Sequence, residues 1–132
     1  MTGLAVKNRQ LGKGGEIDIL VGNFATPGNP LRWLGDYFLI ECKDQGDPVS
    51  ESQFGHFLTK LNLTKTKQGA VISREGFSGS AGFSYARRDQ KIAYSEMAVA
   101  VLDIQLSELQ GLGSADEFLR LLQSKYEELR FH

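Results

Sequence analysis

The segment Tyr37-Phe38-Leu39-Ile40-Glu41-Cys42-Lys43 decides the fold class of this chain. It is a nearly continuous aromatic and aliphatic run, which is typical of a strand that is covered on both faces. Because side chains alternate along a strand, Glu41 and Lys43 share one face while Cys42 lies on the other. We therefore expect a buried strand that carries charges at one end.

Strands and helices are predicted on both sides of this segment. Two short strands joined by a glycine-rich turn precede it, at residues 4–10 and 16–21. Apolar spacing predicts three helices after it, at residues 50–65, 78–91 and 114–130, with strands between them at 70–73 and 97–104. This order predicts an α/β fold with a mixed central β-sheet flanked by α-helices.

Two further features of the sequence predict where helices begin and where a loop packs on the core. Ser50 and Ser114 are predicted helix N-caps, and Gln53 stands three positions after Ser50, the spacing of a capping box. The loop at residues 22–35 is rich in glycine and proline, but Trp33 and its apolar neighbours are expected to dock on the core.

Length and composition predict one globular domain. The chain has 132 residues, 41% of them hydrophobic, which is enough for a core without disulfides. We expect a single domain over residues 1–132, with its core at about 4–104 and a C-terminal helix at 114–130. This domain would be either a separate protein or a fragment of a larger one. No secretory signal or membrane-length apolar run is visible. The one cysteine, Cys42, fits a reducing compartment, so a cytoplasmic location is expected.

The formal net charge of -1 conceals opposite local charges. Residues 1–15 carry +3, residues 16–59 carry -5, residues 60–91 carry +5, and the remainder carries -4. An acidic centre with two basic flanks is the distribution that a metal-dependent enzyme acting on a phosphate backbone requires. The lysines at 60, 65 and 67 also fit an ordinary solvated helix face.

Acidic residues on two predicted strands point to a metal site. If the strand at 16–21 neighbours the strand at 37–43, Asp18, Glu41 and Lys43 converge on one face, with Glu16 one step away. Converging carboxylates need a compensating cation, and magnesium takes one or two of them while keeping several waters. A lysine beside the ion can orient water or stabilise charge on a phosphate. The alternative is that these residues are solvent-facing charges at strand ends.

These residues resemble the PD-(D/E)xK, or restriction-endonuclease-like, nuclease superfamily. The resemblance rests on the segments 15–20 and 38–43, followed by the helix start at Ser50 and the later segment 73–77, and it spans residues 14–104. Within this superfamily, the chain is most similar to the catalytic domain of Mrr-type restriction enzymes. It implies a restriction-endonuclease-like core and a metal-dependent endodeoxyribonuclease that acts in DNA restriction or processing.

The resemblance also implies roles for individual residues. Asp18 and Glu41 would bind Mg²⁺, with Mn²⁺ as a substitute, and the backbone carbonyl of Cys42 would complete the protein ligands. Lys43 would position or activate the water, and Gln53 matches a polar residue that points back toward the catalytic site in this group. Glu16 has no fixed role in the family; here it would lie just behind the metal ligands or serve as an alternate ligand. Contacts with DNA are expected from four basic residues: Lys13, Arg74, Arg87 and Arg88.

One departure from the family concerns the start of the chain. Family members usually carry a helix before the first strand, often with a glutamate that joins the metal site. Here that helix would be absent, supplied by a partner, or replaced by the helix at 114–130. We expect DNA as the partner, and a homodimer, a specificity domain or a partner subunit are compatible with cutting both strands. The alternative function is a catalytically incomplete nuclease-fold module that binds DNA or a protein.

Overall fold

A computed structural model describes residues 4–11, 17–23, 30–79 and 86–131 of the chain. The elements follow one another along the sequence as β1 (Leu4–Leu11), β2 (Ile17–Asn23), η2 (Pro30–Leu34), β3 (Tyr37–Lys43), α1 (Glu51–Leu63), β4 (Gln68–Ser73), α2 (Ala86–Met97), β5 (Ala100–Gln105), α3 (Leu106–Gln110) and α4 (Ala115–Phe131).

The five strands form one mixed sheet in the order β1-β2-β3-β4-β5. β1, β2 and β3 pair antiparallel, whereas β3, β4 and β5 pair parallel. The two parallel connections carry α1 and α2, as parallel crossovers usually do. The predicted α/β class with a mixed, helix-flanked sheet is confirmed.

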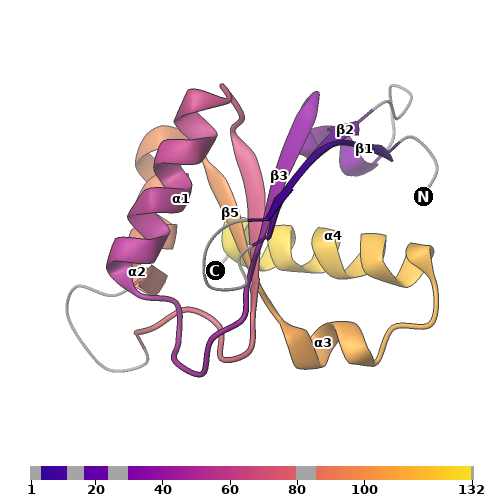
Figure 1. The fold of residues 1–132 in the computed structure, drawn as a ribbon. Coiled ribbons are helices and arrows are strands. Elements are labelled where there is room, and N and C mark those ends of the chain that lie inside the picture. Colours follow the sequence, from indigo (N-terminus) through magenta and orange to yellow (C-terminus); the bar gives the residue numbers. More distant parts are fainter. Residues whose placement is uncertain (1–3, 12–16, 24–29, 80–85, 132) are drawn as a thin grey trace.

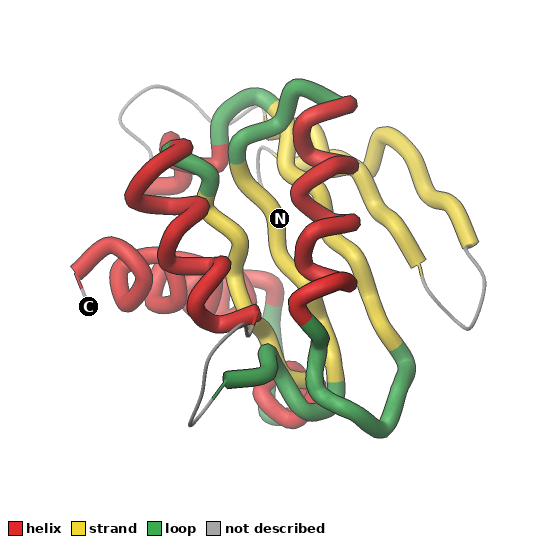
Figure 2. The backbone as a smooth tube through the Cα atoms, turned by 90° about the vertical axis from the view of Figure 1, so that its left-hand side faces the viewer, coloured by secondary structure: helices red, strands yellow, loops and turns green. Residues whose placement is uncertain are grey.

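Helices cover both faces of the sheet, with α1 and α2 on one side and α3 and α4 on the other (Figure 1 and Figure 2). Alternation along β3 supplies both cores. Leu39 packs in the cluster with Phe54, Phe57 and the other buried residues of α1 and α2. Ile40 packs in the second cluster, with Leu122 of α4 and other apolar residues. Burial on both faces explains why β3 is almost continuously apolar.

Several elements match the sequence-based predictions closely. β3 covers the predicted residues, and α1 begins after Ser50, whose side chain accepts from the Gln53 backbone while Gln53 accepts from the Ser50 backbone. α4 packs its predicted apolar stripe on the second core cluster. The expected docking of the 22–35 loop is confirmed in part by η2, because Leu34 is fully buried.

The helix predicted at 78–91 is confirmed over residues 86–91, but its predicted bounds were wrong. α2 spans residues 86–97 instead, and residues 80–85 lie outside the described ranges. Ala86, Gln90 and Ala93 form its buried stripe, which shows that the helical spacing starts later than predicted. The helix ends in a left-handed residue, Ala98, with φ 55°, and Val99 N–H donates to the Ala93 carbonyl. Because the helix ends this way, β5 begins at residue 100 and not at 97 as predicted, and Met97 belongs to the helix.

After β5, residues 106–110 form the short helix α3, in a segment for which the sequence predicted no element. Glu108 accepts a hydrogen bond from the Gln105 backbone at the start of α3.

No helix within the described ranges is both long and apolar enough to cross a membrane.

Candidate active site

The register between β2 and β3 places Asp18 directly opposite Glu41. Opposed positions of an antiparallel pair lie on the same face of the sheet. The expectation that these two strands are neighbours is therefore confirmed. Lys43 lies two residues further along the same strand and so on the same face as Glu41. The side chain of Asp18 and the whole of Glu16 and Lys13 lie outside the described part of the chain.

Glu41 is buried in the layer between the sheet and α1, with 1% of its surface exposed. Its Oε2 lies 3.3 Å from Nζ of Lys43, whose side chain is 10% exposed. The alternative of solvent-facing strand-end charges is wrong for these two residues. A carboxylate in such a place is tolerated only when cations or donors compensate it. The fold therefore keeps a costly charge that packing alone does not require.

A second lysine, Lys60 of α1, reaches the same carboxylate. Its Nζ lies 2.5 Å from Oε1 of Glu41, and its side chain is 33% exposed. The reading of residue 60 as part of a solvated helix face is therefore wrong. Lys60 follows Phe57 by three positions, so it lies on the sheet-facing side of the helix. That spacing was the available sequence signal, and the charge of the residue concealed it.

Gln53 occupies the first turn of α1 and has local partners. Its Oε1 accepts from the Ser50 backbone at 3.0 Å, and its amide exchanges hydrogen bonds with the side chain of Gln45 at 2.6 and 3.0 Å. Lys60 lies two turns further along the same stripe, about 10 Å along the helix axis. The structure thus gives Gln53 a capping role, and its contribution to catalysis stays a prediction.

The opposed positions on β2 and β3 carry carboxylate residues, which are the ligand type that hard divalent cations take. Within the described residues no three His, Cys, Asp or Glu side chains gather into a metal site. Magnesium needs only one or two carboxylates, supplemented by carbonyl oxygens and water. Glu41 and the opposed Asp18 position supply such a pair, and Cys42 lies next to Glu41 on β3. The Cys42 side chain packs with the core cluster on the opposite face, as expected for an unreactive thiol.

Two of the predicted DNA-binding arginines lie at the surface in ion pairs. Arg74 pairs with Asp44, and both side chains are more than half exposed. Arg88 of α2 lies 3.5 Å from Glu51 and 3.3 Å from Asp89. Exposed pairs of this kind contribute little to stability, so phosphate oxygens can replace the carboxylates at low cost.

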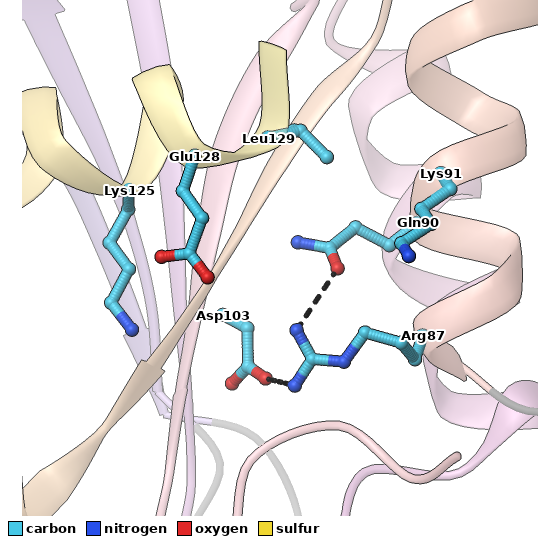
Figure 3. A pocket seen from close by; sticks show the side chains of 7 residues that line it. All are labelled: Arg87, Gln90, Lys91, Asp103, Lys125, Glu128 and Leu129. Carbon is cyan, nitrogen blue, oxygen red and sulfur yellow. Dashed lines mark hydrogen bonds and ion pairs between the residues drawn. The ribbon is translucent and has the colours of Figure 1, made fainter. Parts of the chain in front are cut away.

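Arg87 has a different environment, a pocket of about 170 Å³ between α2, β5 and α4. Its Nη2 donates to Oδ2 of Asp103 at 2.7 Å, and the Phe77 backbone donates to the same oxygen at 3.0 Å. Figure 3 shows the guanidinium directed at this carboxylate and at Gln90. Asp103 is 6% exposed, so Arg87 compensates a buried charge and is the least available of the three for DNA.

The C-terminal helix α4 lies away from Glu41 and Lys43. α4 packs on the face of the sheet that carries Ile40 and Cys42, whereas Glu41 and Lys43 belong to the α1 face. Figure 1 shows α4 on the side of the sheet opposite to α1. The expectation that residues 114–130 complete the metal site is therefore wrong.

No protein-family model, curated protein or solved structure matches this chain.

Proposed function

We propose that this chain is a single magnesium-dependent endodeoxyribonuclease domain with a restriction-endonuclease-like core of the PD-(D/E)xK type. One observation carries the proposal: the buried Glu41 and its partner Lys43 stand on a strand whose neighbour presents Asp18 at the opposed position. A strand-end pair needed only for solubility would not be buried. The cluster combines the two things phosphodiester hydrolysis needs, carboxylates for a metal and a nearby ammonium.

The residues divide the work according to their chemistry. Asp18, Glu41 and the carbonyl of Cys42 would hold Mg²⁺ or Mn²⁺, which supplies Lewis-acid activation of the phosphate and of water. Lys43 would orient the attacking water and stabilise negative charge that develops on the phosphate. Its ammonium is already fixed beside Glu41 at 3.3 Å. Such preorganisation lowers the cost of positioning in the transition state.

Substrate binding is assigned to the basic flanks. Arg74 and Arg88 lie at the surface and would exchange their carboxylate partners for phosphates. Phosphate contacts position DNA without selecting a sequence. Target choice in restriction or DNA processing would therefore come from a further domain, a partner subunit or a second copy of the chain.

A plasmid-nicking assay tests this function. We expect nicking with magnesium, loss of nicking with EDTA, and loss in the Asp18→Ala and Lys43→Ala variants. Lys67→Ala is the matched control, because it removes an exposed lysine from the same basic segment without touching Glu41. Filter binding with the same DNA measures affinity separately from cleavage.

The outcomes separate catalysis from binding. Cleavage that survives chelation, or that survives both substitutions, contradicts the proposed site. Retained DNA affinity with no cleavage by the unmodified chain supports the alternative function, a nuclease-fold module without a complete catalytic site.

A further inference from the structure

The Glu41 carboxylate already has a cation on each oxygen. Lys60 lies 2.5 Å from Oε1, and Lys43 lies 3.3 Å from Oε2. The Lys60 ammonium occupies the position beside Oε1 that a divalent cation would take, so the two cations compete for that oxygen.

The two lysines are not equally fixed. The Lys43 side chain is 10% exposed and comes from the rigid central strand β3. The Lys60 side chain is 33% exposed and comes from the third turn of α1. A lysine ammonium on a flexible four-carbon stem is strongly hydrated and can move into solvent. Lys60 is therefore the cation that can leave with the smaller rearrangement.

We propose that Lys60 is a positioning residue of this site, the resident counter-ion of Glu41 that a divalent metal ion displaces from Oε1. The inference rests on the proposed function, since it assumes that Glu41 is a metal ligand. With no metal bound, Lys60 holds the buried carboxylate in one orientation. When metal binds, the released ammonium stands at the rim of the site, where a phosphate of the substrate would approach.

The sign of the effect distinguishes this role from a purely structural ion pair. A competitor lowers metal affinity, so its removal tightens binding. If Lys60 only held Glu41 in place, its removal would have the opposite effect. The Glu41 carboxylate would be disturbed, and the affinity for a metal ion bound to it would fall. Lys60→Gln is the sharpest variant, because it removes the charge and keeps a hydrogen-bond donor of similar reach.

Calorimetric titration of the full chain with manganese chloride alone provides the test. We expect Lys60→Gln to bind Mn²⁺ about tenfold more tightly than the unmodified chain. Lys60→Arg keeps the charge and should restore the weaker binding. Lys67→Gln is the matched control for loss of a positive charge, and its affinity should equal that of the unmodified chain. Thermal unfolding followed by circular dichroism checks that each variant is folded.

A second measurement uses the unmodified chain, so it does not depend on a variant folding. Acetylation by acetic anhydride, followed by mass spectrometry, should label Lys60 more when Mn²⁺ saturates the site, while Lys67 stays unchanged. Equal or weaker Mn²⁺ binding by folded Lys60→Gln, or unchanged Lys60 labelling, overturns the inference and leaves the nuclease proposal standing. Absence of Mn²⁺ binding in both the unmodified chain and Lys60→Gln overturns both proposals.

Discussion

A double-mutant cycle can measure how much the ion pair between Arg87 and Asp103 contributes to the free energy of unfolding. Asp103 is 6% exposed and receives hydrogen bonds from Arg87 at 2.7 Å and from the Phe77 backbone at 3.0 Å. Arg87→Met removes the guanidinium but keeps the length of the side chain. Asp103→Asn removes the charge but keeps an oxygen that can accept from Phe77.

The structure sets the expected magnitudes. A hydrogen bond to a charged group is worth about 1.5–3 kcal/mol, and the Arg87 side chain is 43% exposed, so solvent screens part of that value. We expect Arg87→Met to lower the free energy of unfolding by about 1–2 kcal/mol, and Asp103→Asn by about 2 kcal/mol. Since the two groups interact directly, the coupling energy should be about 1 kcal/mol or more.

Urea denaturation of the four species, followed by circular dichroism, measures these values. Arg88→Met is the matched control, because its carboxylate partners are surface residues, and it should change stability by less than about 0.5 kcal/mol. Additive effects of the two substitutions, or an Arg87→Met effect no larger than the control, would refute a structural role for Arg87 and return it to the group of DNA-binding candidates.

Three further predictions test other parts of the molecule. Ser50→Ala should lower the free energy of unfolding by about 1 kcal/mol in urea denaturation, because Ser50 Oγ caps α1 at 3.1 Å from the Gln53 backbone nitrogen. Tyr126→Ala should shift the fluorescence emission of Trp33 to longer wavelength, because it removes the ring stacked at 4.2 Å and opens the indole to water; an unchanged spectrum would show that α4 does not dock there. Lys43→Ala should reduce the single-turnover cleavage rate by about a hundredfold or more while DNA affinity measured by filter binding stays constant; a parallel loss of both would indicate a binding role instead.

Sequence reasoning was most successful where a pattern is local. The continuous apolar run fixed β3 to the residue, and the Ser50 and Gln53 capping signature fixed the start of α1 within one position. It was least successful where tertiary contacts decide. α2 was misplaced because its buried stripe of Ala86, Gln90 and Ala93 is small and polar. Such a stripe contains no large apolar side chain to mark where the helix begins, so its bounds depend on the neighbouring elements.

The same distinction applies to the candidate site. Asp18, Glu41 and Lys43 could be grouped in advance, because strand alternation and a short connection between adjacent strands constrain which residues share a face. Partners of the arginines could not be foreseen. The Arg87 partner, Asp103, comes from the edge strand β5, sixteen positions away in sequence, and charge mapping along the chain counts both residues without pairing them.

The position of Lys60 depends on how closely α1 approaches the sheet, and one glycine sets that approach. A Cβ added at Gly69 of β4 would lie 2.7 Å from the Leu39 carbonyl oxygen and 2.7 Å from the Phe57 ring. The ring of Phe57 therefore rests directly on the backbone of the strand, which a side chain at residue 69 would prevent. Lys60 follows Phe57 by one helical turn, so this close packing brings its ammonium within reach of Glu41. The charges around Glu41, the candidate metal ligand, thus depend on the apolar contact between Phe57 and Gly69 of a different strand. The distribution of charges along the sequence carries no information about this contact.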